Sequence, residues 1–236
     1  METQKDKAEN FVPQQEKEQK NSFIFTILCM CFVAVLIVSN IAASNTIDVT
    51  SFMSLSAAEI LFPISYIIND LMVEIYGINK TKKVIFLGLA VCLCSLFFLY
   101  LTTLLPTGYS EYQVVFGISS GSIIGITVAS VVAFIAGSLI NSYIMHWLKL
   151  KHKEKKFFFR AVLSTVAGEL LDSLIFISFC CLLASQFYSW DRLLPFVLTI
   201  TAIKVLVEIV LFPLTKYLLK VIKKQEKKHS KNQVQK

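Results

Sequence analysis

Long apolar runs alternate with short polar segments along most of this chain. A helix that crosses the hydrocarbon core of a bilayer needs about 20 predominantly apolar residues. Runs of this kind predict transmembrane helices over residues 22–44, 60–77, 84–105, 120–148, 160–185 and 195–222. Residues 1–21 are polar and are predicted to be disordered, and residues 223–236 form a basic tail. The predicted fold is therefore all-α, a polytopic membrane six-helix bundle within residues 22–222.

Composition supports a membrane protein and argues against several classes of enzyme. Of the 236 residues, 55% are hydrophobic, which is more than a soluble domain of this length carries. The six cysteines lie within apolar runs, so we expect buried thiols rather than disulfides or a metal site. The sequence has no phosphate-binding loop, dinucleotide fingerprint or nucleophile elbow. We therefore expect no enzymatic activity, no metal and no cofactor, and no hydrolysis of ATP, so any energy that the protein uses must come from a gradient or a partner.

The distribution of positive charge predicts the orientation of the helices. Of the 23 Lys and Arg residues, 21 lie in the N-terminal tail, in residues 78–83, in residues 149–160 or from Lys216 onward. These segments are alternate connections of the predicted bundle. Bases collect on the cytoplasmic side of membrane proteins, so both termini are expected to be cytoplasmic. The basic C-terminal tail is typical of a segment beside anionic lipid, and we do not expect it to bind nucleic acid.

Small residues recur at every fourth position of the predicted fourth span. The series is Gly117, Gly121, Gly125, Ala129, Ala133, Gly137 and Asn141. The fifth span repeats the spacing with Ser164, Gly168 and Asp172. Residues four apart share one face of a helix, and a face of small residues lets a neighbouring helix approach closely. We predict that these two helices pack against each other, the alternative being a smooth face against lipid.

Ionisable residues inside the apolar runs are the strongest functional signal. Residues 60–77 carry Asp70 and Glu74 one turn apart, where like charges repel. A charged group in hydrocarbon costs about 2.5–3.5 kcal/mol even on lenient scales, so such groups normally face a protein interior or a wet cavity. Together with nearby amide and phenol donors they suggest a substrate-binding site. The predicted set is Tyr66, Asn69, Asp70, Glu74, Asn141, Glu169, Asp172, Lys204 and Glu208.

Each of these groups also has a purely structural interpretation. Lys204 and Glu208 are four residues apart and could pair with each other. Glu74 could reach Lys82 or Lys83 at the membrane surface, and the two acids of the fifth span could be held by neighbouring side chains. Five acids and one base cannot all be ionised in a bundle of low dielectric. We therefore expect some of the acids to meet a proton, an ion or a substrate.

Four segments give the chain a resemblance to a known family. They are FPISYIINDLMVEIYG at 62–77, GSLINSYIMHWLK at 137–149, RAVLSTVAGELLDSLIF at 160–176 and KVLVEIVLFPLTKYLLKVIKKQE at 204–226. In this order they resemble the bacterial queuosine-precursor transporters of the vitamin uptake transporter group, and they span most of the membrane portion. Residues 57–59, Ala-Ala-Glu, depart from the Gly-containing stretch expected before the first segment.

The resemblance implies import of a 7-deazaguanine, such as 7-cyano- or 7-aminomethyl-7-deazaguanine or queuine, for tRNA modification. It also implies a bundle similar to the substrate-binding components of energy-coupling-factor transporters, in a bacterial cytoplasmic (inner) membrane. A carboxylate accepts two parallel N–H bonds, so Glu169 or Asp70 is expected to receive the guanine edge. Lys204 and Glu208 are expected to order the site or to take part in proton or sodium coupling. The competing interpretations are uptake of another vitamin or purine, an intramembrane enzyme with a general acid/base pair, and a passive structural protein.

Overall fold

The computed structural model describes residues 23–42, 46–50, 53–103, 122–152, 156–183 and 190–234. This part of the chain contains six α-helices: α1 (Phe23–Ala42), α2 (Ala58–Tyr76), α3 (Ile78–Thr103), α5 (Ser122–His152), α6 (Phe157–Leu183) and α7 (Leu193–Val234). A short 3-10 turn, η1 (Trp190–Arg192), precedes α7. The predicted membrane helical bundle is confirmed in outline. Residues 1–21, predicted to be disordered, and residues 104–121 lie outside the described part of the chain.

A small β-hairpin connects α1 to α2, where a polar loop was predicted. Strands β1 (Thr46–Thr50) and β2 (Met53–Ser56) are antiparallel, with Thr46 opposite Ser56. The Oγ of Ser56 then accepts a hydrogen bond from the backbone N–H of Ala58, at the start of α2. The predicted all-α bundle is therefore correct, and the hairpin is a short addition in one of its connections. Two short strands of mixed polarity carry too weak a pattern to be told from a loop.

A single glycine separates α2 from α3, although the sequence predicted a longer connection. Gly77 has a positive φ of 82°. Glycine adopts this backbone conformation at little cost because it has no Cβ. Its backbone N–H donates to the carbonyl of Val73, which closes the end of α2. The backbone N–H and the hydroxyl of Thr81 both donate hydrogen bonds to the Gly77 carbonyl. As a result α3 begins at Ile78 rather than near residue 84, and its basic first turns are helical.

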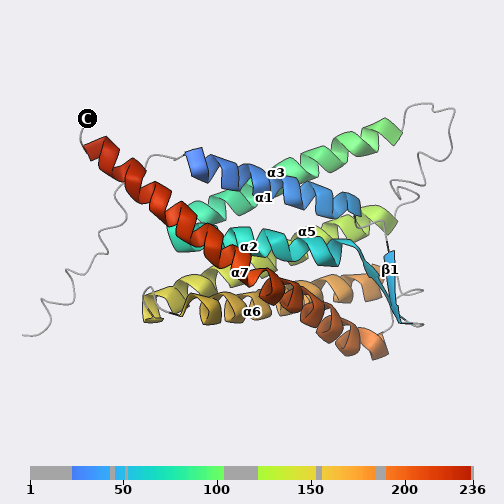
Figure 1. The fold of residues 1–236 in the computed structure, drawn as a ribbon. Helices are drawn as coiled ribbons and strands as arrows, with labels where there is room; N and C mark the ends of the chain where they lie inside the picture. The colour runs from blue at the N-terminus through green and yellow to red at the C-terminus, as the bar shows by residue number, and fades with distance from the viewer. Residues whose placement is uncertain are drawn as a thin grey trace, which may run out of the picture.

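Helix α2 lies in the interior of the bundle. Every residue from Ser65 to Glu74 is buried. In Figure 1, α1 and α3 lie on one side of α2, α6 lies on the other, and α7 crosses obliquely. By length and composition, the other five helices are each long and apolar enough to cross a membrane, whereas α2 is not. Its three carboxylates lower its apolarity, and the surrounding helices shield it from lipid.

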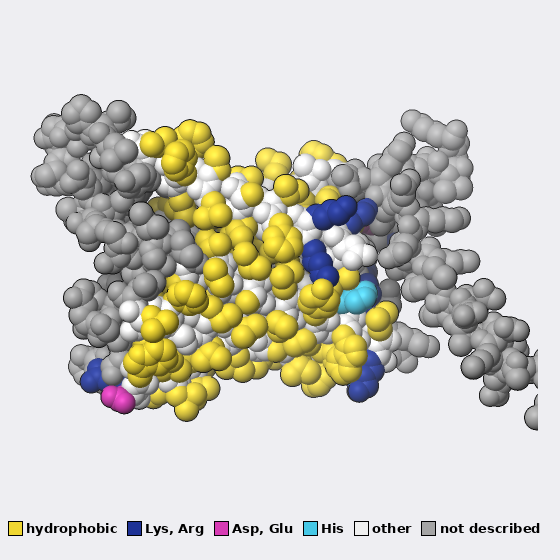
Figure 2. All heavy atoms as spheres, turned by 180° about the vertical axis from the view of Figure 1, so that it is seen from behind, with side chains coloured by type: hydrophobic (Ala, Val, Ile, Leu, Met, Phe, Trp, Pro, Cys, Tyr) yellow, Lys and Arg dark blue, Asp and Glu magenta, His cyan; other side chains and the backbone are white. Residues whose placement is uncertain are grey.

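The outside of the bundle is apolar. Large hydrophobic side chains are exposed along each of the long helices, as at Phe97, Leu182 and Val210. Figure 2 shows them across the middle of one face, with Lys and Arg gathered toward one end. A soluble protein rarely leaves so wide an apolar area in water, so this surface fits a bilayer. We call the end that carries the bases of α3, α5 and α7 the basic end, and the opposite end the hairpin end.

The predicted contact between the two helices with small residues at every fourth position is confirmed. These helices are α5 and α6. A Cβ placed on Gly137 of α5 would lie 2.8 Å from the carbonyl oxygen of Gly168 in α6. A Cβ on Gly168 would lie 2.8 Å from the carbonyl oxygen of Gly137. The two backbones therefore approach more closely than larger residues allow. Gly117 and Gly121 lie outside the described residues.

Candidate functional site

Lys204 of α7 is the centre of the most densely charged region in the bundle interior. Its Nζ lies 2.7 Å from Asp172 Oδ2, 2.9 Å from Glu169 Oε2 and 3.1 Å from Glu59 Oε2. We call these four residues the Lys204 cluster. The Lys204 side chain is only 3% exposed. One ammonium group thus meets three carboxylates where the dielectric constant is low, and the cluster carries a surplus of acid.

Three helices build the Lys204 cluster. Glu169 and Asp172 are three residues apart on α6, so both point to the same side of that helix. Glu59 lies in the first turn of α2, where the helix dipole stabilises a negative charge. Glu169 is fully buried, and its Oε1 has no hydrogen-bond partner among the described residues. An unpaired buried carboxylate oxygen is costly, so this atom is available to a donor on a ligand.

Aromatic rings and hydroxyl groups lie around the same cluster. Lys204 Nζ is 5.5 Å from the ring centroid of Phe62. The ring of Tyr66 is buried against the close approach of Gly137 and Gly168, and it interacts electrostatically with the acids of α6. One turn before Lys204, the buried Thr201 hydroxyl has no hydrogen-bond partner within the described part of the chain. The region therefore combines charge, hydroxyl groups and aromatic surface.

Asn69 and Asn141 join α2 to α5 on the neighbouring side of α2. Asn69 Nδ2 donates to Ser142 Oγ at 3.0 Å, and Ser142 Oγ lies 3.2 Å from Asn69 Oδ1. Asn141 Nδ2 donates to Asp70 Oδ1 at 2.9 Å. The amide of Asn69, predicted as a ligand donor, is therefore already used in helix packing. Asp70 and Asn141 form a polar pair separate from the Lys204 cluster.

Glu208 does not pair with Lys204, although the two residues are one turn apart on α7. Lys204 is bound to the three acids of its cluster instead. Glu208 is buried and interacts electrostatically with Asp70 of α2 and Thr165 of α6. The structural alternative of a Lys204–Glu208 pair within one helix is therefore wrong. The two residues belong to different polar groups.

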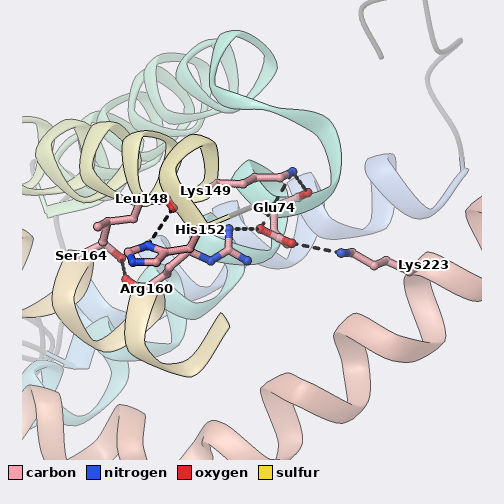
Figure 3. Close-up of polar contacts among 7 residues, drawn as sticks. All are labelled: Glu74, Leu148, Lys149, His152, Arg160, Ser164 and Lys223. Atoms are coloured by element: carbon pink, nitrogen blue, oxygen red, sulfur yellow. Dashed lines mark hydrogen bonds and ion pairs between the residues drawn. The ribbon is translucent and has the colours of Figure 1, made fainter. Parts of the chain in front are cut away.

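Glu74 is surrounded by cations at the basic end (Figure 3). Arg160 Nη1 lies 3.0 Å from Glu74 Oε2, and Lys223 Nζ lies 3.0 Å from Glu74 Oε1. Lys149 Nζ donates to the backbone carbonyl of Glu74 and is 3.9 Å from its carboxylate. We call these four residues the Glu74 cluster. The structural alternative of a surface pair between Glu74 and Lys82 or Lys83 is therefore wrong, since the partners are Lys149, Arg160 and Lys223.

The Glu74 cluster differs in charge from the Lys204 cluster. Three cations face one carboxylate, so Glu74 is fully compensated and links α2 to α5, α6 and α7. Lys82 instead contacts the ring and hydroxyl of Tyr143 on α5. The structure thus brings Glu169, Asp172 and Lys204 together and keeps Glu74 at the other end of α2.

Four members of these clusters were not in the predicted set: Glu59, Lys149, Arg160 and Lys223. The two lysines were counted only among the bases that predict orientation. Glu59 was not proposed as a site residue because it lies just before the predicted span at 60–77. It was noted only because residues 57–59 depart from the family pattern. Arg160 was counted among the bases outside the membrane, but it is fully buried. A signal was present, since Arg160 continues the fourth-residue spacing of Ser164, Gly168 and Asp172 on one face of α6.

The comparison with protein families agrees with this architecture. A family model described as a putative vitamin uptake transporter matches residues 56–218. The chain belongs to this family. The range that matches the vitamin uptake transporter family includes the whole Lys204 cluster and ends before Lys223 of the Glu74 cluster. No curated protein and no solved structure matches the chain. Membership in the family, together with the apolar helices, makes the chain a multi-pass membrane protein of the transporter class.

Proposed function

We propose that this chain imports a queuosine precursor, a 7-deazaguanine, across the bacterial cytoplasmic membrane for tRNA modification. The observation that carries the proposal is the Lys204 cluster, in which three buried carboxylates face one ammonium group. Buried acid in excess of base needs a donor-rich partner. A guanine-type base supplies such donors, and its size suits a site between helices of one bundle.

The chemistry of the cluster fits the edge of a guanine. The ring N–H and the exocyclic amine of a 7-deazaguanine are parallel donors, and one carboxylate accepts both. Glu169 offers the unpaired Oε1 for this contact. Lys204 is placed to donate to the carbonyl oxygen of the base, and the rings of Phe62 and Tyr66 offer flat surfaces for stacking. Asp172 and Glu59 then position Lys204.

Uptake by point variants tests the assignment. In cells unable to make or import the precursor, we expect Glu169→Gln and Lys204→Met to reduce uptake of labelled 7-deazaguanine roughly 10- to 100-fold. A hydrogen bond to a charged group is worth about 1.5–3 kcal/mol, which corresponds to this loss. Queuosine in tRNA would fall in parallel.

The matched control is Asp191→Asn, an acid on the exposed turn η1. All variants are compared at equal amounts in the membrane. Wild-type uptake by Glu169→Gln contradicts the proposed contact with the guanine edge.

Uptake of a different heterocyclic vitamin is the second candidate, favoured by the description of the family. A carboxylate with a free oxygen accepts N–H donors from other heterocycles as well. Competition separates the two candidates. Unlabelled guanine-type bases block uptake of labelled 7-deazaguanine if the first candidate is correct. Block by an unrelated vitamin, with no effect of guanine analogues, favours the second.

A further inference from the structure

The Lys204 cluster contains more negative charge than its own cation balances. Glu59, Glu169 and Asp172 each place an oxygen within 3.1 Å of the same ammonium group. Among the described residues, no second Lys, Arg or His forms an ion pair with these acids, since the other ion pairs all involve Glu74. Three ionised carboxylates and one ammonium group leave a net charge of −2 in the cluster.

Hydrogen bonds from a neutral ligand do not remove this charge. The N–H groups of a neutral heterocycle stabilise a buried carboxylate, but the site keeps its negative charge. Buried charge is costly unless an opposite charge compensates it. A ligand with a positive charge supplies a counter-charge together with its N–H donors. The cluster therefore suits a cation better than a neutral molecule of the same shape.

The three acids of the cluster differ in depth. The Glu169 side chain is 0% exposed, and its Oε1 has no hydrogen-bond partner in the described part of the chain. The side chains of Glu59 and Asp172 are 10% and 13% exposed. We expect Glu169 to contact the ring of a ligand, and the two less buried acids to contact a substituent of that ring.

Glu59 is the acid that is bound least closely to Lys204. Its oxygen lies 3.1 Å from the Lys204 Nζ, whereas Asp172 accepts a hydrogen bond from the same Nζ at 2.7 Å. Glu59 also lies in the first turn of α2, directly after the hairpin, and not within one of the long apolar helices. It is therefore the carboxylate that a second ammonium group reaches most easily.

Aromatic and hydroxyl groups surround the cluster on the side of Asp172. The Tyr66 hydroxyl and the Asp172 Cβ both lie beside the position that a Cβ of Gly137 would occupy. This hydroxyl is buried and has no hydrogen-bond partner among the described residues. The Phe62 ring lies 5.5 Å from the Lys204 Nζ. Aromatic faces attract organic cations, and carboxylates accept their N–H bonds, so the region contains both kinds of group that bind an organic ammonium ion.

We propose that the substrate is a cation whose ammonium group binds Glu59 and Asp172 while Glu169 receives the ring. Among the 7-deazaguanines this arrangement selects the aminomethyl form over the uncharged cyano form, because a primary alkyl amine is protonated at neutral pH. Glu59 is the residue that determines this preference. The choice of a 7-deazaguanine ring rests on the proposed function, whereas the requirement for a positive charge does not.

Binding to the purified full chain tests the requirement for charge. The ligands are 7-aminomethyl-, 7-hydroxymethyl- and 7-cyano-7-deazaguanine, which share one ring, and the hydroxymethyl form donates a hydrogen bond without carrying a charge. We expect the aminomethyl form to bind about 10-fold more tightly than either neutral form, because hydrogen bonds between charged groups are the stronger ones. Equal or tighter binding of a neutral form overturns the proposal and leaves the proposed function intact.

Glu59→Gln tests the assignment of the preference to Glu59. Glutamine keeps the shape of the side chain and one acceptor oxygen but removes the charge. We expect the preference for the aminomethyl over the hydroxymethyl form to fall about 10-fold, with little change in the affinity for the hydroxymethyl form. A variant that weakens the binding of all three ligands equally shows that Glu59 only positions Lys204, and it overturns the assignment. The exposed Asp191→Asn is the control and keeps the wild-type preference.

A second pair of ligands separates the charge from the ring. The probes are an aminomethyl pyrimidine and its hydroxymethyl analogue, which differ in charge and lack a guanine edge. Tighter binding of the aminomethyl pyrimidine, with no binding of any 7-deazaguanine, contradicts the proposed function but supports the requirement for a cation. Failure of the wild type to bind a cation of either series overturns the proposal.

Discussion

Arg160 is the largest fully buried side chain in the described part of the protein. A buried guanidinium is tolerated only when a carboxylate compensates its charge, and Glu74 does so at 3.0 Å. Because the two residues come from α6 and α2, the contact fixes how these helices are rotated relative to each other. The stability of the basic end therefore depends on this one buried ion pair more than on the partly exposed lysines near it.

Removal of Arg160 tests that dependence. Arg160→Met leaves Glu74 with Lys149 and Lys223, whose side chains are 22% and 29% exposed. Breaking a buried pair costs about 3–5 kcal/mol, so we expect a clear decrease in thermal stability in detergent. The double variant Arg160→Met with Glu74→Gln should recover much of the loss, since it leaves no fully buried charge and the two remaining lysines are partly exposed to solvent. Equal stability of the single and double variants contradicts this account.

At the level of single residues, the sequence predicts which buried ionisable side chains are functional candidates better than it predicts which residues they contact. Asp70, Glu169 and Lys204 were recognisable because ionised groups in an apolar run are costly. Their partners were not recognisable, because a pair between helices depends on the rotation of each helix about its axis. Lys204 shows the limit, since its neighbour Glu208 on the same helix was a reasonable partner and is not the one observed.

Helices α5 and α6 approach each other closely because the residues at the centre of their contact are glycines without side chains. Gly137 and Gly168 face each other across the contact, and the Tyr66 hydroxyl fills the space beside Gly137. The contact therefore places Glu169 and Asp172 at a fixed distance from Tyr66. Any residue larger than glycine at these positions must push α5 away from α6.

Gly137→Ala tests the close approach. Its Cβ would collide with the Tyr66 hydroxyl and with the backbone of Gly168, which cannot move as a side chain can. We expect a loss of about 1–3 kcal/mol in stability, as is typical of overpacking, together with impaired substrate uptake.

Gly88→Ala is the matched control for this substitution. Its Cβ would meet the ring of Phe32 at 3.0 Å, and a ring can turn aside. Equal effects of the two substitutions on thermal stability contradict a special role for the α5–α6 contact.

At the level of elements, long helices were predictable and short connections were not. Apolar runs of membrane length identify a helix by length alone, and the small residues every fourth position predicted the α5–α6 contact. The hairpin between α1 and α2 and the one-residue joint at Gly77 depend on backbone geometry within a few residues. A pattern averaged over many residues does not resolve such features.

The whole molecule separates its charges along one axis. Apolar side chains cover the middle of the face in Figure 2, and most of the Lys and Arg on that face lie toward one end. By the positive-inside rule this basic end is expected to face the cytoplasm. The hairpin and η1 would then face the outside. The charge distribution along the sequence predicted this separation, but it contained no information about the clusters inside the bundle.

Labelling of single cysteines tests the orientation. In a cysteine-free background, Asp191→Cys should react with a membrane-impermeant maleimide added to intact cells. Lys224→Cys should react only after the cells are opened. Asp191 is exposed just before α7 begins, and Lys224 is exposed in the C-terminal part of α7. The side of the membrane on which each residue lies therefore decides whether it reacts. The reverse pattern places the termini outside.

Helix α7 carries cations of both clusters on one continuous rod. Lys204 and Lys223 are separated by about 28 Å along the axis at 1.5 Å per residue, and Pro213 lies between them. If the rod moves as a rigid body, both lysines must leave their carboxylates together. Proline removes a backbone hydrogen bond and eases bending at this point. A hinge at Pro213 would therefore allow one end of the bundle to open while the other stays locked, which is the mechanical requirement of alternating access.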